Sequence, residues 1–79
     1  MNNSKAHKNI ESQLPALFEK LGVPVDRRDV KILGNEEIVD VYALTDDGTI
    51  NMNFCGQTGN YLFTERWNKI RFSWDFLDV

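Results

Sequence analysis

The residues of this 79-residue chain that could act as nucleophiles or proton carriers are few and isolated. The only histidine, His7, has Lys5 and Lys8 as near neighbours and no partner residue close by in the sequence. The only cysteine, Cys55, would need an adjacent base to act as a nucleophile, and His7 is far away along the chain. These residues therefore indicate neither nucleophilic nor acid–base catalysis.

Two glycine-containing stretches have only part of a ligand-binding motif. Residues 56–59, GQTG, have the glycines of a phosphate-binding loop but lack its Lys and Ser/Thr ending. Residues 46–48, DDG, lack the later acidic ligands of a calcium loop and instead predict a turn. The carboxylates of Asp75 and Asp78 have no recognisable metal spacing. We therefore expect a protein that is not an enzyme and uses no cofactor and no metal ion.

Charge is distributed unevenly along the chain, whose net charge is −3. No Lys or Arg occurs between Lys31 and Arg66, whereas the same stretch carries six acidic residues: Glu36, Glu37, Asp40, Asp46, Asp47 and Glu65. Such a stretch is either a solvated face that keeps a small protein soluble or a docking surface for a basic partner. The overall acidity opposes the long-range attraction on which nucleic-acid binding depends.

Length and composition predict one domain over residues 1–79. Apolar residues make up 42% of the chain, which is sufficient for a folded core and argues against disorder. No apolar run is long enough for a membrane span or follows the first charged residues as in a signal peptide. We therefore expect a soluble cytoplasmic protein without membrane attachment, and the single cysteine fits a reducing compartment.

The first segment, SKAHKNIESQLPALFEKLG, predicts a helix. Ser4 can cap its start, Gly22 stands where a left-handed residue closes a helix, and apolar residues recur at spacings of three and four: Ala6, Ile10, Leu14, Leu17, Phe18 and Leu21. Pro15 conflicts with a regular helix interior. Either the helix kinks at Pro15 or a second helix begins there; the unbroken phase of the apolar stripe favours one kinked helix.

The middle of the chain predicts strands. Val30 and Ile32 indicate a short strand, and residues 38–55 a hairpin whose two loop residues are Asp47 and Gly48, both with positive φ. In this pairing Asp46 lies opposite Thr49 and Val41 opposite Phe54. The face expected in the core carries Val39, Val41, Ala43, Ile50, Met52 and Phe54. The opposite face carries Ile38, Asp40, Tyr42 and Leu44 against Asn51 and Asn53.

The C-terminal segment allows two interpretations. Residues 62–77 form either a hairpin, turning at Trp67-Asn68 or Asn68-Lys69, or a helix with a stripe of Phe63, Trp67, Ile70, Trp74 and Leu77. The hairpin is favoured because aromatic residues prefer strands. It would place Tyr61 and Phe63 on one face with Phe72 and Trp74, and the alternating residues Ile70, Phe72, Trp74 and Phe76 would face the core.

The expected fold is α+β: an N-terminal helix packed on one face of a four-stranded antiparallel β-meander. The expected function is that of a small acidic interaction protein, of the inhibitor or immunity type found in phages and mobile elements, which modulates or inhibits a larger partner that could itself bind nucleic acid. The partner would be a protein with a basic surface, and the predicted contact residues are Asp40, Tyr42, Leu44 and Asp46. The alternatives are self-association through the same face, as a homodimer, and nucleic-acid binding through Arg66, Trp67, Lys69 and Arg71.

Overall fold

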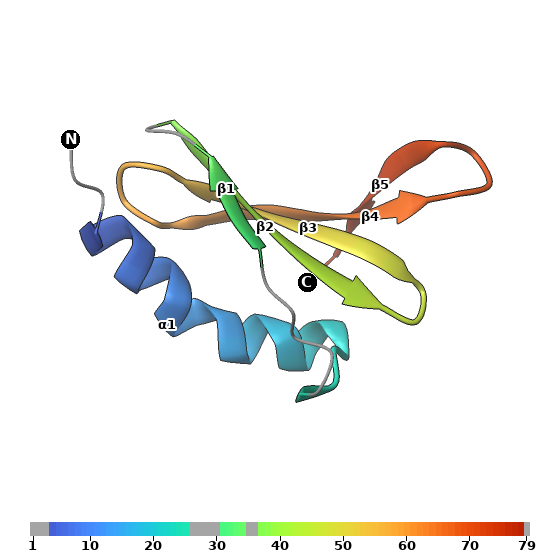
Figure 1. Ribbon diagram of the computed structural model, residues 1–79, viewed down its shortest axis with the longest axis horizontal. Helices are drawn as coiled ribbons and strands as arrows, with labels where there is room; N and C mark the ends of the chain where they lie inside the picture. Colours follow the sequence, from blue (N-terminus) through green and yellow to red (C-terminus); the bar gives the residue numbers. More distant parts are fainter. Residues whose placement is uncertain (1–3, 26–30, 35–36, 79) are drawn as a thin grey trace.

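A computed structural model describes residues 4–25, 31–34 and 37–78. One helix precedes five strands: α1 (Ser4–Leu21), β1 (Lys31–Gly34), β2 (Ile38–Thr45), β3 (Gly48–Cys55), β4 (Tyr61–Asn68) and β5 (Ser73–Leu77). The strands pair antiparallel in chain order, and α1 lies across one face of the sheet (Figure 1). The predicted α+β meander is confirmed, with β1–β4 and a fifth strand, β5, at the edge. Val30, predicted to begin the first strand, lies outside the described residues.

The N-terminal segment forms one helix that continues through Pro15. Pro15 is exposed, and the stripe residues Ala6, Ile10, Leu14, Leu17 and Phe18 are all buried. At the C-terminus of α1, Gly22 adopts the expected positive φ of 71°. There the N–H of Gly22 donates to the carbonyl of Glu19 and the N–H of Val23 to that of Phe18. These bonds pair carbonyls that the helix end would otherwise leave unsatisfied.

The central hairpin has the predicted faces but a different turn. Thr45 pairs with Gly48 and Val41 with Met52, so the loop residues are Asp46 and Asp47 and the register differs by two residues from the predicted one. Gly48 has a φ of 128°, whereas Asp47 does not have the positive φ predicted for it. The Thr45 hydroxyl accepts a hydrogen bond from the N–H of Asp47 and donates one to the carbonyl of Gly48. These two bonds close a turn that begins one residue earlier than predicted. A shift of two residues leaves every side chain on its original face.

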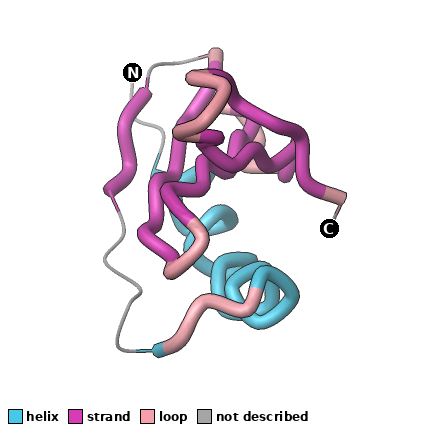
Figure 2. Tube along the Cα trace, turned by 90° about the vertical axis from the view of Figure 1, so that its right-hand side faces the viewer, coloured by secondary structure: helices cyan, strands magenta, loops and turns pink. Residues whose placement is uncertain are grey.

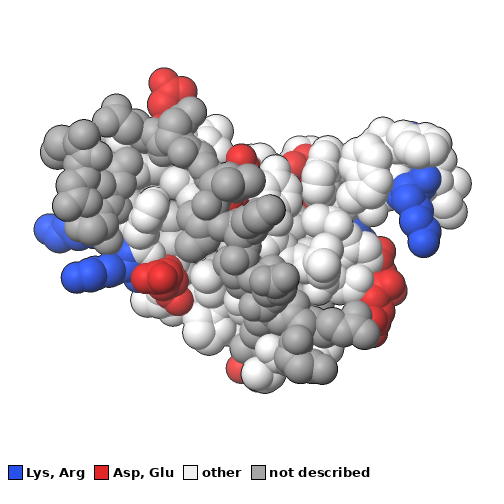
Figure 3. Space-filling model, in the orientation of Figure 1, with Lys and Arg blue, Asp and Glu red and all other residues white. Residues whose placement is uncertain are grey.

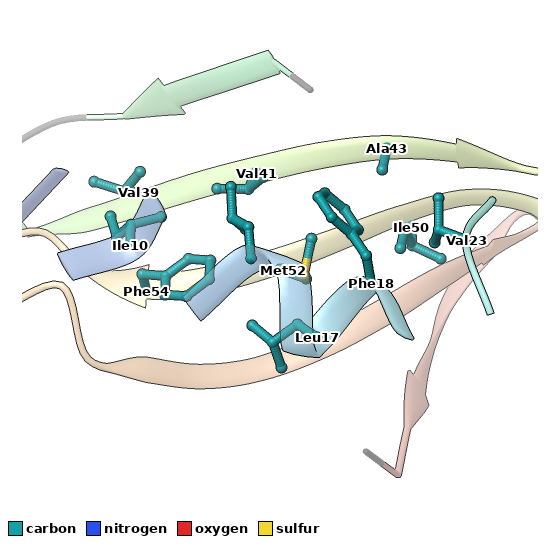
Figure 4. Packing of buried hydrophobic residues seen from close by; sticks show 11 residues of the cluster. Ile10, Leu17, Phe18, Val23, Val39, Val41, Ala43, Ile50, Met52 and Phe54 are labelled. Atoms are coloured by element: carbon teal, nitrogen blue, oxygen red, sulfur yellow. The ribbon is translucent and has the colours of Figure 1, made fainter. Parts of the chain in front are cut away.

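The core lies between α1 and the adjacent face of β2 and β3. All six sheet residues expected there are at most 1% exposed: Val39, Val41, Ala43, Ile50, Met52 and Phe54. They pack against the apolar stripe of α1 (Figure 4), and the two layers are seen end-on in Figure 2. Burial of this continuous apolar surface is the main stabilising contribution that the fold provides.

Residues 61–77 form a hairpin, but the core position predicted for the row Ile70, Phe72, Trp74 and Phe76 is wrong. Ile70, Phe72 and Phe76 are 84%, 77% and 74% exposed, and Trp74 is 37% exposed. The turn occupies residues 69–72, so Ile70 and Phe72 lie in it rather than in a strand. Trp74 pairs with Trp67 on the sheet face opposite α1.

A β-bulge explains why alternation failed in β4. The register shifts between Asn53 and Phe54, so that Phe54 pairs with Tyr61 but Asn53 pairs with Phe63. The Tyr61 ring packs on Phe54 at the core, with its hydroxyl 2.6 Å from that of Thr64. Phe63 points to the opposite face. An extra residue in one strand reverses the side-chain parity, so Tyr61 and Phe63 do not share the face predicted for them.

Candidate functional site

The sheet face opposite α1, here called the outer face, carries five aromatic side chains that come from three strands. Tyr42 lies on β2, Phe63 and Trp67 on β4, and Trp74 and Phe76 on β5. Ring centroids are 5.4 Å apart for Trp67 and Trp74, 5.5 Å for Phe63 and Phe76, and 6.4 Å for Tyr42 and Trp74. We call these five residues the outer aromatic cluster.

The contact between Tyr42 and Trp74 shows that the outer face is curled. Their strands, β2 and β5, are separated by β3 and β4. In a flat sheet, three strand spacings would place these residues about 14 Å apart. Because the rings lie 6.4 Å apart, the twisted sheet must bring them together over the intervening strands. The twist can be followed in Figure 2.

Two asparagines of β3 lie beneath these rings. Asn51 is 7% exposed and Asn53 is 5% exposed. Asn51 pairs with Tyr42 on one side and Glu65 on the other, and Asn53 pairs with Phe63 of β4. The Oδ1 atom of Asn51 and the Nδ2 atom of Asn53 are buried without a hydrogen-bond partner. Since an unpaired buried polar atom costs about 1–3 kcal/mol, these two amides are a cost that the fold carries beneath the rings.

The polar groups around the aromatic rings are acidic. Asp40 of β2 and Glu65 of β4 point to the outer face and are half-buried. The pKa of Tyr42 is raised by its burial and by the negative charges of Asp40 and Glu65. The outer face of β2–β5 contains no Lys or Arg, so nothing on these strands neutralises the two carboxylates. On β1, Lys31 is the register partner of Tyr42 and so holds a basic position beside this acidic group. The outer face of β2–β5 thus combines exposed rings with two carboxylates.

The predicted contact residues are partly brought together. Asp40, Tyr42 and Leu44 share the outer face, as expected, and Leu44 is 55% exposed. Asp46 lies in the turn after β2 and is exposed. Acidic side chains are visible at the end of this hairpin in Figure 3. Trp67 was predicted only as part of the basic site. Phe63, Trp74 and Phe76 were missed because the sequence does not reveal the bulge in β4.

The residues of the predicted basic site are divided between different environments. Arg66, Trp67 and Lys69 line a cleft of about 280 Å³, together with Asp47, Asn68, Ile70, Asp75 and Leu77. Arg71 is not part of this lining, and its Nη2 atom lies 2.8 Å from Oδ1 of Asp75. The cleft mixes basic and acidic side chains. It therefore does not form the continuous positive surface that binds a nucleic-acid backbone.

The tip of the β4–β5 hairpin is held by Asn68. Its Oδ1 accepts hydrogen bonds from the N–H groups of Ile70 and Arg71, and its Nδ2 donates to Asp75. The hydrogen bonds from Asn68 and Arg71 lower the pKa of Asp75. The backbone of Phe72 has a φ of 55°, which is rare for a bulky residue. A turn held by side-chain hydrogen bonds therefore carries two exposed apolar side chains, those of Ile70 and Phe72.

Cys55 and the following GQTG stretch belong to a loop that is hydrogen-bonded to α1. The loop docks on α1 through a hydrogen bond from Asn9 Nδ2 to the carbonyl of Thr58 and one from Gln13 Nε2 to that of Gly59. Hydrogen bonds from the Thr58 side chain and from the backbone of Thr58 and Gln57 lower the pKa of Cys55. Within the described part of the chain, no three His, Cys, Asp or Glu side chains form a group that could hold a metal ion.

Comparison of the chain with models of protein families, with curated proteins and with solved structures found no match. The described residues include no helix with the length and apolar character needed to cross a bilayer. The geometry of the outer face is therefore the basis for a functional conclusion.

Proposed function

We propose that this protein is a non-catalytic protein–protein interaction module that binds a larger partner through its outer face and modulates or blocks it. The observation that carries the proposal is the outer aromatic cluster, exposed at one face of a small domain and bordered by Asp40 and Glu65. Aromatic anchors within a charged rim are typical of the centres of protein interfaces.

The charges of this face favour a basic partner over a second copy of the chain. A two-fold dimer built on the outer face would bring Asp40 and Glu65 of both copies together. Among the described strand positions of that face only Lys31 of β1 is basic, so two carboxylates of each copy would face one cation. Like charges juxtaposed at an interface are unfavourable, whereas a basic surface would neutralise both carboxylates. No comparable feature favours nucleic-acid binding by the β4–β5 turn.

The proposal is tested by site-specific photo-crosslinking in the source cell. A photoreactive residue at Phe76, which is 74% exposed, should give a defined adduct with one protein. The same group at Glu11, an exposed residue of α1, should not. The double variant Leu44→Ser/Phe76→Ser should abolish capture of that protein while the circular dichroism spectrum stays native, because both side chains are exposed. Equal capture by the parent and the double variant would contradict the proposal.

A further inference from the structure

We propose that the outer aromatic cluster receives an arginine side chain of the partner, seated between Tyr42 and Phe76 above Asn51 and Glu65. This inference rests on the proposed function and adds the chemistry of the group that is recognised. The four residues are successive cross-strand neighbours on β2, β3, β4 and β5. Two polar side chains thus lie between two rings, and the centroid of the Trp74 ring lies 6.4 Å from that of Tyr42.

The aromatic rings supply the first part of the recognition. A guanidinium group lying on an aromatic face is attracted by the ring quadrupole, and tryptophan is the strongest of the aromatic partners. Trp74 and Phe76 remain 37% and 74% exposed, so an incoming side chain can reach them. The flat guanidinium stacks on such rings, whereas the ammonium of lysine is a compact and strongly hydrated charge. This difference favours arginine.

The polar groups supply the second part. Asp40 and Glu65 offer carboxylate acceptors, and Asn51 offers the unpaired Oδ1. Arginine carries five N–H donors and no acceptor, which matches this excess of acceptors. The unpaired Nδ2 of Asn53 is a donor, and a backbone carbonyl of the same partner segment can accept its hydrogen bond. Both amide atoms are fully buried in the unbound protein, so an arginine within an extended peptide pairs with them only when the side chains that cover them move aside.

A direct test uses tryptophan fluorescence, because the only tryptophans of the chain, Trp67 and Trp74, both belong to the outer aromatic cluster. The intact protein is titrated with the peptide acetyl-(Gly-Arg)4-amide and with matched peptides that carry lysine or citrulline instead of arginine. Citrulline keeps the planar shape but removes the charge. We expect saturable quenching by the arginine peptide, about tenfold weaker binding of the lysine peptide and no saturable change with the citrulline peptide.

Variants locate the binding within the face. Glu65→Gln removes one carboxylate without changing the shape of the side chain, and it should weaken binding of the arginine peptide by about tenfold. Glu11→Gln removes the same charge from the exposed side of α1 and should leave binding unchanged within about twofold, since long-range attraction is screened by salt. Phe76→Leu, which retains an apolar side chain but removes the ring, should also weaken binding.

The outcomes separate this inference from the proposed function. Equal binding of the arginine and citrulline peptides, an unchanged affinity after Glu65→Gln, or no saturable binding would overturn the arginine site. If Leu44→Ser/Phe76→Ser still abolishes partner capture in that case, the outer face docks a protein by apolar contact alone. Quenching by a single-stranded oligonucleotide of the same length, with none by the arginine peptide, would overturn the inference in favour of base stacking.

Discussion

At the scale of single residues, Gly59 shows how a glycine in an apparent ligand loop can serve the fold. It has a φ of 79°, and a Cβ atom added there would overlap the carbonyl of Ala6 and lie 2.9 Å from Cβ of Asn9. The backbone of the loop approaches α1 too closely for any side chain at this position. The GQTG stretch is therefore explained by docking on the helix.

Gly59→Ala should lower the free energy of unfolding by about 2–5 kcal/mol, from backbone strain and steric overlap together. Gly22→Ala is the matched control. Gly22 has a similar φ of 71°, but an added Cβ would meet no atom within 4 Å. Gly22→Ala should lower the free energy of unfolding by about 1 kcal/mol, from the backbone conformation alone. Urea unfolding of both variants measures the difference, and equal losses would argue against the close approach of the loop to α1.

Cys55 should ionise more readily than an ordinary cysteine. Because its pKa is lowered by hydrogen bonds from Thr58 and Gln57, the thiolate forms at a lower pH than in a free thiol. The rate of alkylation by iodoacetamide should therefore reach half of its maximum at a pH below that of free cysteine. Thr58→Val removes the side-chain donor and should move the profile to higher pH. As the chain has one cysteine, the assay reports on Cys55 alone. A dependence of the alkylation rate on pH like that of free cysteine would contradict the hydrogen bonds from Thr58 and Gln57 to the thiol.

At the scale of elements, the faces of the β4–β5 hairpin are determined by the bulge in β4. Strand pairing is antiparallel and alternates as in any hairpin, and a turn of four residues keeps the parity of a turn of two. The bulge beside Phe54 therefore decides which residues face α1. With four residues between Asn68 and Ser73, Asp75 and Leu77 fall on the core face, and Trp74 and Phe76 fall on the outer face. The aromatic residues of this hairpin other than Tyr61 therefore lie on the outer face or in the turn.

Phe72→Gly should raise stability slightly, by about 0.5–1 kcal/mol. Its side chain is 77% exposed, and its φ of 55° costs a bulky residue about 1–2 kcal/mol, more than the added freedom of glycine in the unfolded chain. Phe54→Ala, at 0% exposure, should instead cost about 3–5 kcal/mol. Thermal and urea unfolding compare the two. A large loss with Phe72→Gly would restore the buried position that alternation suggests.

The stability of the hairpin should depend on Asp75 at acidic pH. Its pKa is lowered in the folded state by Asn68 and then by Arg71, so the carboxylate stabilises the fold above its ordinary pKa of 3.8. This contribution is lost as the pH falls from about that value through the lower, folded-state pKa. Asp75→Asn should reduce the loss of stability on acidification over this range, as measured by urea unfolding at a series of pH values. If the free energy of unfolding falls with pH equally in the parent and in Asp75→Asn, the carboxylate of Asp75 does not contribute to the acid sensitivity.

At the scale of the whole molecule, the two faces of the sheet have separate roles. The face under α1 holds the apolar core, while the outer face presents rings and carboxylates to the surroundings. Basic side chains are seen at the β4–β5 hairpin and acidic ones at the end of the β2–β3 hairpin in Figure 3. A basic partner should therefore be attracted to one side of the molecule in preference to the other.

Association with a basic partner should be sensitive to salt. Asp40→Lys with Glu65→Lys reverses the charge of the outer face, so the association rate should fall most at low ionic strength, where screening is weakest. Stopped-flow tryptophan fluorescence at several salt concentrations measures this rate. Glu11→Lys with Glu19→Lys makes the same change in net charge on exposed residues of α1 and should have a smaller effect. Equal effects of the two double variants would indicate attraction by net charge alone.

The sequence by itself determined the helix, the central hairpin and the core. Periodicity is a local property, so the stripe of α1 and the alternation of β2 and β3 identify their buried faces without knowledge of the fold. Asp40, Tyr42 and Leu44 were placed on one face for the same reason, and a register shift of two residues could not move them.

Only the tertiary structure decided which face the last hairpin shows to solvent. The bulge beside Phe54 changes side-chain parity, and the four-residue turn before Ser73 carries Ile70 and Phe72 out of the strand; neither has a clear local signal in the sequence. The meeting of Tyr42 with Trp74 across two intervening strands depends on the twist of the whole sheet. The core could be predicted because it follows from local pattern, whereas the outer aromatic cluster arises from register and curvature, which the complete sheet sets.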